Sequence, residues 1–115
     1  MNLEEKMKTI EATAEKFGCF ILVKAVVDII SDGKVTYLIE GGNQGLTKGG
    51  TGDLLAGLVL SFASKNDQLT AMILSSYFLK KTAEELFKKK GYWYNINDLI
   101  ETVPQVIKRS IFIKK

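Results

Sequence analysis

The chain has 115 residues and a formal net charge of +3, and this length fits one small domain rather than two. With 46% hydrophobic and 25% charged residues, it has enough apolar material for a core, which excludes a generic disordered chain. The single cysteine and the absence of histidine exclude an intramolecular disulfide, Ser-His-Asp and Cys-His catalysis and most zinc sites.

The positive charge is mild and comes almost entirely from lysine, because Arg109 is the only arginine. Nucleic-acid binders usually carry an arginine-rich stripe, and the lysine run at 88–90 is explained as the cationic end of a helix. No uncharged run approaches the roughly 20 residues that span a bilayer, and the first residues lack the apolar core of a signal peptide. We therefore expect a cytoplasmic protein with no nucleic-acid partner and no membrane partner.

The N-terminal part predicts one helix and then a strand. Apolar residues recur at helical spacing among charged residues over 2–17, and Gly18 is placed to end this helix. The continuous apolar run 20–23 is typical of a strand that is buried on both faces. Nothing that flanks Cys19 favours a nucleophile, so we expect a small, buried apolar side chain there.

Two runs rich in β-branched residues, 26–30 and 35–39, predict a hairpin. The four residues 31–34 lie between these runs, and their Asp32-Gly33 pair is a strong signal for a tight turn between antiparallel strands. After the second strand, 41–52 has no periodicity and is dense in glycine, so it predicts a loop.

The rest of the chain predicts helices. The run 53–63 has little polar character, so we expect both of its sides to be covered. Asp67 is placed to cap a long helix over 68–89, which Gly91 ends. We expect the inward face of this helix to consist of Leu69, Ile73, Tyr77, Ala83 and Phe87.

Two short helices are expected at the C-terminal end. Asn95 caps the first, which runs to Glu101, and Pro104 fits the first turn of the second, over 103–109. Trp93, with its two tyrosine neighbours, can stack on a nucleotide base or form a hydrophobic plug between helices, and we favour the plug. The element order indicates an α/β protein with only part of a sheet.

The segment 41–53 is the part of the sequence that points to function. It follows a strand and opens a helix, and glycines at 49, 50 and 52 allow the backbone to approach a ligand closely. The first N–H groups of a helix have no internal partner and favour an anion such as phosphate. The segment does not have the ending of a Walker A loop or the spacing of a dinucleotide fingerprint.

Asp53 adds a carboxylate to this predicted anion site. A base beside a phosphate can accept or donate a proton where the transferred group lies. The alternative is an ordinary first-turn acid at the end of a plain loop. The glycine density over thirteen residues favours the functional interpretation.

The run Gly42-Asn43-Gln44-Gly45-Leu46-Thr47-Lys48-Gly49-Gly50-Thr51-Gly52-Asp53-Leu54-Leu55-Ala56-Gly57 resembles the signature of the ADP/ATP-dependent NAD(P)H-hydrate dehydratases, which belong to the ribokinase-like superfamily. Asn43, Gly45 and Gly49-Gly50-Thr51 resemble this branch rather than the wider superfamily, which keeps only a G-x-G-D core. The residues 21–24 resemble the family's strand that ends in Lys-Gly, and 97–101 with Pro104 resemble its C-terminal helices.

The resemblance implies dehydration of hydrated NADH or NADPH, in which ADP or ATP phosphorylates the hydrate hydroxyl and phosphate then leaves. It implies that Asp53 contacts the substrate and is the catalytic base, and that Mg²⁺ accompanies the nucleotide, with no metal ligand assigned. The residues that it implies for nucleotide binding are Lys24, Asp28, Asn43, Gln44, Gly45, Leu46, Thr47, Lys48, Gly49, Gly50, Thr51 and Gly52. From spacing alone, an edge lysine that reaches water is the slightly better interpretation of Lys24, and it is the resemblance that favours phosphate binding.

The sequence departs from the family pattern at several positions. Ala25 stands where the family usually has glycine, Asp28 where threonine is frequent, and Gln44 where proline is frequent. The residues 77–80 stand where the long helix usually contains a His-Gly pair. The family domain is also far longer, so the resemblance implies that residues 1–115 form the C-terminal half of a ribokinase-like α/β/α domain, with the glycine loop at 41–53.

Two other functions stay open. One is a kinase of the same superfamily that acts on a sugar or a vitamin precursor. The other is a non-catalytic nucleotide-binding or assembly subunit. In each case we expect the half-domain to need a partner, which is either a separate N-terminal half-domain chain or a second copy of this chain.

Overall fold

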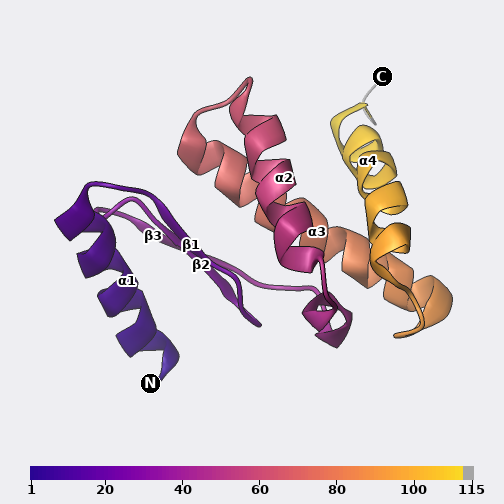
Figure 1. Cartoon of the computed structure of the whole chain (residues 1–115), viewed down its shortest axis with the longest axis horizontal. Helices are drawn as coiled ribbons and strands as arrows, with labels where there is room; N and C mark the ends of the chain where they lie inside the picture. The colour runs from indigo at the N-terminus through magenta and orange to yellow at the C-terminus, as the bar shows by residue number, and fades with distance from the viewer. Residues whose placement is uncertain (113–115) are drawn as a thin grey trace.

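The computed structural model describes residues 1–112 and shows a small sheet between helical layers (Figure 1). Helix α1 covers one face of the sheet, and α3 packs against the other face, while α2 and α4 pack against α3. The elements in chain order are α1 (Leu3–Phe17), β1 (Ile21–Val23), β2 (Asp28–Ser31), β3 (Thr36–Ile39), the 3₁₀ helix η1 (Gln44–Thr47), α2 (Thr51–Ala63), α3 (Gln68–Lys90) and α4 (Ile96–Phe112).

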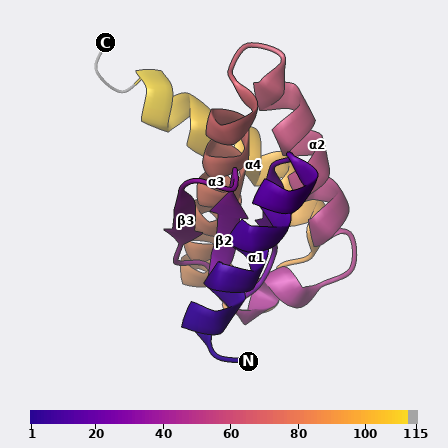
Figure 2. The same cartoon turned by 90° about the vertical axis from the view of Figure 1, so that its left-hand side faces the viewer.

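The predicted first helix is confirmed as α1, with the expected ends. The Asn2 side chain accepts a hydrogen bond from the Glu5 backbone N–H, and Gly18 adopts the left-handed conformation with φ of 60°. Figure 2 shows α1 lying in front of the sheet. The expectation of a buried Cys19 is wrong, because the chain leaves α1 at this point and the cysteine is exposed.

The hairpin is confirmed, and it forms part of an antiparallel sheet with the order β1-β2-β3 in the described residues. The turn is closed by the Asp32 N–H, which donates to the Val35 carbonyl. Gly33 is the first central residue and has φ of 95°, a conformation that suits a two-residue hairpin turn. A Cβ atom there would also lie 2.8 Å from the Glu15 backbone, so only glycine lets the turn pack on α1.

Strand β2 is the central and buried strand, with Ile29 and Ile30 almost fully covered. Strand β1 lies at an edge, and its three residues are only half-buried, so the expectation of burial on both faces is wrong within these residues. Phe20 precedes the strand and is exposed. An edge strand has a hydrogen-bonded neighbour on one side only, which leaves its other side open.

Helix α3 is the central helix, with its predicted Asp67 cap and Gly91 end confirmed. Tyr77 and Phe87 do not point inward as expected, because both are more than 40% exposed. The helix is covered by the sheet on one side and by α2 and α4 on others, so its buried surface is wider than a single stripe. The buried residues are Ala71, Met72, Ser75, Ser76, Phe78, Leu79, Lys80, Thr82, Ala83 and Leu86.

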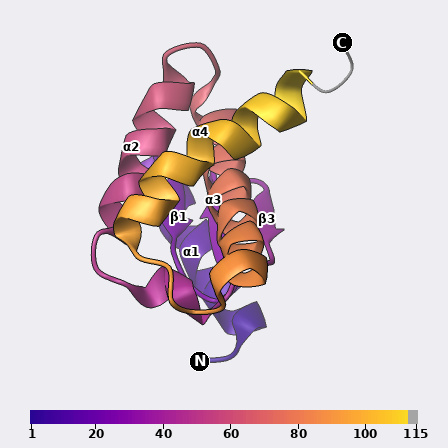
Figure 3. The ribbon, with the colours of Figure 1, turned by 90° about the vertical axis from the view of Figure 1, so that its right-hand side faces the viewer.

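The two predicted C-terminal helices are one continuous helix, α4, with Pro104 inside it. Leu99, Val103 and Val106 are all buried at helical spacing, and their common apolar face holds the helix together across the missing N–H of the proline. Figure 3 shows α4 crossing in front of α3.

The expectation that α2 is covered on both sides is also wrong in this chain, since Leu60 is 77% exposed.

None of the helices within residues 1–112 combines the length and the apolar character needed to cross a membrane.

Candidate functional site

The glycine segment is held in place by hydrogen bonds to one carbonyl. The Leu46 carbonyl accepts from the Lys24 ammonium at 2.8 Å and from the Thr51 hydroxyl at 2.8 Å. Lys24 follows β1 and Thr51 is the first residue of α2, so the carbonyl joins the end of the sheet to the start of the helix. The buried Thr51 hydroxyl also lies 2.9 Å from the Lys48 carbonyl, which closes the loop between η1 and α2.

Asn43 caps η1 and connects the segment to two helical regions. Its Oδ1 atom accepts from the Gly45 N–H at 3.0 Å and from the Tyr94 hydroxyl at 2.5 Å. Its Nδ2 atom donates to the Ala83 carbonyl of α3 at 2.9 Å. The side chains of Asn43 and Thr51 therefore bind the protein itself, and they shape the segment that the sequence predicts to hold a nucleotide.

The glycines of the segment have different environments. A Cβ atom at Gly45 would overlap the Tyr94 ring, and Gly50 adopts φ of 90° where it caps α2. Gly49 and Gly52 face open space: in the described part of the chain, a methyl group at either position would meet no atom of another segment within 4 Å. Packing thus explains the need for glycine at 45, and backbone conformation explains it at 50, while 49 and 52 are exposed at the surface.

The start of α2 offers donors beside a carboxylate. No side chain caps this helix, and the N–H groups of Gly52 and Asp53 have no acceptor within residues 1–112. Asp53 lies in the first turn and is exposed. Free N–H groups and the positive end of the helix dipole suit an anion at this position.

A cavity of about 560 Å³ is lined by parts of both predicted nucleotide-binding segments. The first wall consists of Lys24, Ala25 and Val26 of the β1–β2 connection and of Asp28, the first residue of β2. The second wall is the run from Gly41 to Gln44, with Leu46 and Thr47. Leu79 and Lys80 of α3 and Tyr92 complete the lining. The residues 48–53, including Asp53, and Gly45 are not among the lining residues.

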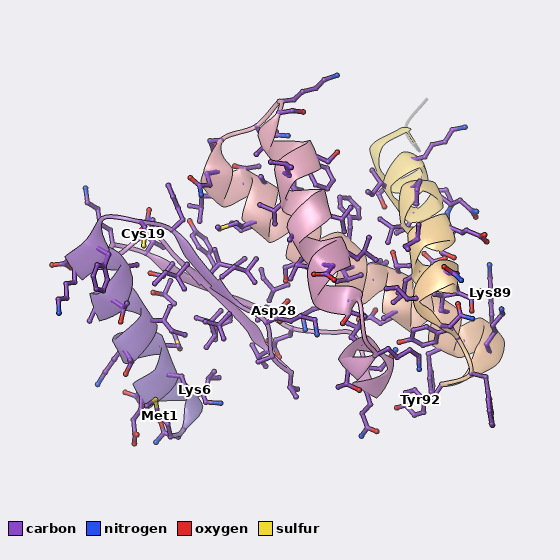
Figure 4. The ribbon with its side chains drawn as sticks, in the orientation of Figure 1. Met1, Lys6, Cys19, Asp28, Lys89 and Tyr92 are labelled. Atoms are coloured by element: carbon purple, nitrogen blue, oxygen red, sulfur yellow. The ribbon has the colours of Figure 1, made fainter. Side chains whose placement is uncertain are left out.

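Figure 4 labels Asp28 between the sheet and the helical part of the structure. The resemblance implies this residue as a nucleotide ligand, but it is 4% exposed and engaged by protein groups. Its carboxylate accepts from the Ala25 N–H at 2.8 Å and from the Ser76 hydroxyl at 2.6 Å. It also forms an ion pair at 3.7 Å with Lys80, a residue that sequence reasoning did not assign to the site. Lys80 lies one helical turn from the buried Ser76 and from Glu84, so a correctly placed inward face would have included it.

Glu84 and Lys48 add two contacts to the segment that the sequence does not reveal. The Glu84 carboxylate accepts from the Gly42 N–H at 2.9 Å. The Lys48 ammonium donates to the Tyr92 carbonyl at 3.2 Å and lies 4.9 Å from the centre of the Tyr94 ring. Both contacts link the segment to α3 or to the connection that follows it.

The three consecutive aromatic residues have three different environments. Tyr94 is 1% exposed, and burial raises the pKa of its phenol above the ordinary value. Tyr92 lines the cavity and packs against Phe87, with ring centres 4.7 Å apart. Trp93 is 91% exposed, so the expectation that it plugs the helices is wrong and Tyr94 occupies that place.

The described residues contain no group of three or more acidic, histidine or cysteine side chains that could hold a metal ion. Mg²⁺ is commonly held by one or two carboxylates together with nucleotide phosphates and water. The chain itself therefore provides no protein cage for this ion within residues 1–112.

Comparisons with known proteins match nearly the whole chain. Residues 1–105 match the model of a protein family described as NAD(P)H-hydrate dehydratase. The bifunctional NAD(P)H-hydrate repair enzyme Nnr of Pyrobaculum aerophilum is 36% identical over 112 residues, which are 96% of this chain and 22% of the relative. The ADP-dependent (S)-NAD(P)H-hydrate dehydratase of Nitrosopumilus maritimus is 37% identical over 105 residues, which are 90% of this chain and 37% of the relative.

Solved structures share the fold. A hydroxyethylthiazole kinase protein from Pyrococcus horikoshii superposes with a TM-score of 0.78 at 24% identity, over 91% of this chain and 41% of the kinase. The ADP/ATP-dependent NAD(P)H-hydrate dehydratase from Bacillus subtilis, co-crystallized with ATP and Mg²⁺, superposes with a TM-score of 0.76 at 24% identity, over 92% of this chain and 39% of that enzyme. The chain thus spans well under half of each of these proteins.

Proposed function

This chain belongs to the NAD(P)H-hydrate dehydratase family, and from that membership we propose that it supplies the nucleotide-binding and catalytic segments of an enzyme that dehydrates hydrated NADH or NADPH with ADP or ATP. The observation that carries the proposal is the cavity between the two motif segments, 24–28 and 41–47. The β2–β3 hairpin separates these segments in the sequence, and both contribute to the lining of this one cavity.

In the proposed reaction, the hydroxyl oxygen of the hydrated nicotinamide ring attacks the terminal phosphorus of the nucleotide. The exposed Asp53 carboxylate accepts the hydroxyl proton, and the shortened nucleotide leaves as the O–P bond forms. The C–O bond of the phosphorylated intermediate then breaks, and loss of phosphate and a ring proton restores NADH or NADPH.

In this proposal, the N–H groups at the start of α2 hold the transferred phosphoryl group. Gly49 and Gly52 add no side chain that would block it, and the N–H groups of Gly52 and Asp53 have no acceptor within residues 1–112. Fixed donors of this kind stabilise the charge of a phosphoryl group during transfer. Mg²⁺, when bound with the phosphates, would neutralise part of their charge, and no step of the proposal depends on a metal ligand from this chain.

The cavity is the proposed site of the remaining part of the nucleotide. Lys24, Gln44 and Thr47 bring polar side chains to its walls, and Tyr92 brings an aromatic face. Ala25 also lines it, where the family resemblance implies glycine, so its methyl group narrows this part of the site. Asn43 and Thr51 act by holding the segment in shape.

We further propose that residues 1–115 are one part of a larger domain, completed by a separate N-terminal half-domain chain or by a second copy of this chain. The sheet has three strands and two open edges in the described residues, and Val26 and Leu60 are 89% and 77% exposed. Exposed apolar side chains and unpaired strand edges both favour association.

The test of the catalytic role is Asp53→Asn in the completed enzyme. We expect turnover of NADH hydrate to fall by at least about a hundredfold, because the proton acceptor is lost, while ADP binding is retained. The fold should survive, since one first-turn charge contributes only about 0.3–1 kcal/mol. Turnover is followed by the return of NADH absorbance at 340 nm.

Glu101→Gln is the control, because Glu101 is an exposed acid on α4 with no role in the proposed site. Full turnover in Asp53→Asn would contradict the assignment of the base. A stable phosphorylated product, formed instead of NADH, would replace the dehydratase proposal with a kinase of the same superfamily. Nucleotide binding without turnover of any candidate substrate by the wild-type assembly would indicate a binding subunit.

A further inference from the structure

Lys80 is a buried cation in the middle of α3, with only 4% of its surface exposed. Its ammonium lies 3.0 Å from the Val26 carbonyl, 3.3 Å from the Gly41 carbonyl and 3.5 Å from the Ala25 carbonyl. An ammonium has three N–H donors, and these carbonyls are enough to use all of them. Lys80 therefore binds backbone rather than solvent.

Asp28 balances the charge of Lys80 across a longer distance of 3.7 Å. Both of its carboxylate oxygens have shorter contacts elsewhere, to the Ala25 N–H and to the Ser76 hydroxyl. The three partners of Asp28 come from two places: Ala25 lies in the β1–β2 connection, and Ser76 and Lys80 lie on α3. The pair thus closes the β1–β2 connection onto the central helix.

The carbonyls that Lys80 binds belong to both walls of the cavity. Ala25 and Val26 lie on the first wall, and Gly41 lies on the second. These walls are the two segments at which the nucleotide is proposed to bind. One ammonium on the central helix α3 therefore bridges them and holds the three carbonyls within 3.5 Å of one nitrogen atom.

We propose that Lys80, neutralised by Asp28, is a positioning residue that fixes the separation of the two walls of the nucleotide cavity and thereby sets nucleotide affinity. This inference rests on the proposed function. The distances favour anchoring over simple charge pairing, because the ammonium is closer to each of the three carbonyls than to the carboxylate. A buried ion pair by itself contributes little to folding stability, since replacing both charged residues with apolar ones is often tolerated.

The test compares two variants with the wild type, each within the completed enzyme: Lys80→Met and Asp28→Asn/Lys80→Met, both of which lack the ammonium. In Lys80→Met the Asp28 carboxylate keeps its hydrogen bonds to the Ala25 N–H and to the Ser76 hydroxyl. In the double variant, no buried charge is left unpaired. Both variants lose the Lys80 bridge, while the hydrogen bond from Lys24 to the Leu46 carbonyl stays. Lys81→Met is the control, because Lys81 is the exposed neighbour on the same helix.

The first readout is the dissociation constant for ADP, measured by isothermal titration calorimetry. We expect the control Lys81→Met to bind ADP within about threefold of the wild type, and both Lys80 variants to bind at least about tenfold more weakly, because small displacements of a site cost large factors. The second readout is amide hydrogen exchange without nucleotide. We expect exchange at 25–28 and 41–42 to become faster in the two Lys80 variants and not in Lys81→Met.

The outcomes separate this inference from the proposed function. If the wild-type completed enzyme does not bind ADP, the proposed function fails, while hydrogen exchange still tests the bridge. If the wild type binds ADP and the double variant binds it equally well, or exchange is unchanged on either wall, the positioning role is overturned. Should the double variant not fold, Asp28→Leu/Lys80→Leu replaces the pair with apolar side chains and carries the same expectations.

Discussion

The glycine segment is shaped by a few hydrogen bonds that converge on Asn43 and on the Leu46 carbonyl. Asn43 contacts the backbone at Gly45 and at Ala83 and the Tyr94 hydroxyl, so one side chain links η1, α3 and the start of the last helix. Residues in a motif can therefore be required for the form of a loop without touching its ligand. The glycines of the segment also differ in role. Gly45 is needed because the Tyr94 ring packs against it, whereas Gly49 lies at the open surface.

Replacing Gly45 with alanine tests this division. Its new methyl group would overlap the Tyr94 ring, which is buried and hydrogen-bonded, so neither group can move away easily. We expect Gly45→Ala to lower the free energy of unfolding by about 1–3 kcal/mol, as overpacking does. Gly49→Ala is the matched control, since its methyl group meets open space and should change stability by less than about 0.5 kcal/mol. Urea denaturation measures both, and equal stabilities would contradict the packing role.

At the scale of elements, α4 shows how burial can override a local break. Pro104 is a natural first-turn residue, and for that reason the sequence predicts a new helix there. The structure instead keeps one helix, because Leu99, Val103 and Val106 lie on one buried face that continues past the proline. The preference of Pro104 for the first turn of a helix is thus outweighed by the free energy gained when three apolar side chains are buried.

Pro104→Ala distinguishes the two arrangements. In a continuous helix, alanine restores the missing N–H donor at an exposed position, and we expect a gain of about 1–3 kcal/mol in the free energy of unfolding. If the chain formed two helices, with proline in the first turn of the second, the substitution would leave stability unchanged or lower it. Thermal unfolding followed by circular dichroism measures the difference.

The start of α3 makes stability depend on pH. The Asp67 carboxylate accepts from the Thr70 backbone N–H and hydroxyl, and the backbone hydrogen bond, followed by the hydroxyl, lowers its pKa below the ordinary 3.8. Because the pKa is lower in the folded state, its contribution to stability is present above about pH 3.8 and is lost as the pH falls through the folded pKa.

Asp67→Asn keeps a capping side chain but removes this titration. We expect the wild type to lose more stability than the variant between pH 5 and pH 2.5, measured by urea denaturation across this range. Asp32 and Asp98 also have lowered pKa values, but they are present in both proteins, so their effects cancel in the comparison. Parallel pH profiles would show that the cap does not titrate differently on folding.

The whole molecule has an open, three-stranded sheet and exposed apolar groups at several places. We predict that the isolated chain is a homo-oligomer or poorly soluble, and that it is inactive on NADH hydrate. Co-expression with an N-terminal half of the domain should give a soluble one-to-one complex that turns over. Light scattering measures the oligomeric state, and the NADH absorbance assay measures turnover of NADH hydrate. A monodisperse monomer that is active alone would overturn the proposal of a partial domain.

Several predicted helix ends and the hairpin turn, which depend on local chemistry, are confirmed, whereas the helix start predicted from Pro104 is not. Gly18, Asp67 and Gly91 end or begin helices where expected, and the Asp32-Gly33 turn closes the hairpin, because capping groups and left-handed conformations act within a few residues. The family resemblance, carried by one uninterrupted run of motif residues, is confirmed by the match over residues 1–105. Asp53 as the base stays a prediction, although its place in the first turn of α2 was foreseen.

Other features were decided only by contacts between distant segments. The buried Lys80, the exposed Trp93 and the inward face of α3 depend on which neighbours cover each side, and a helical periodicity gives the spacing of a stripe without saying how many elements pack around it. The cavity likewise needs residues 24–28 and 41–47 to meet, which no local preference encodes. Local hydrogen bonds thus determined where elements begin and end, whereas the burial of α3 between the sheet, α2 and α4 decided which side chains reach the site.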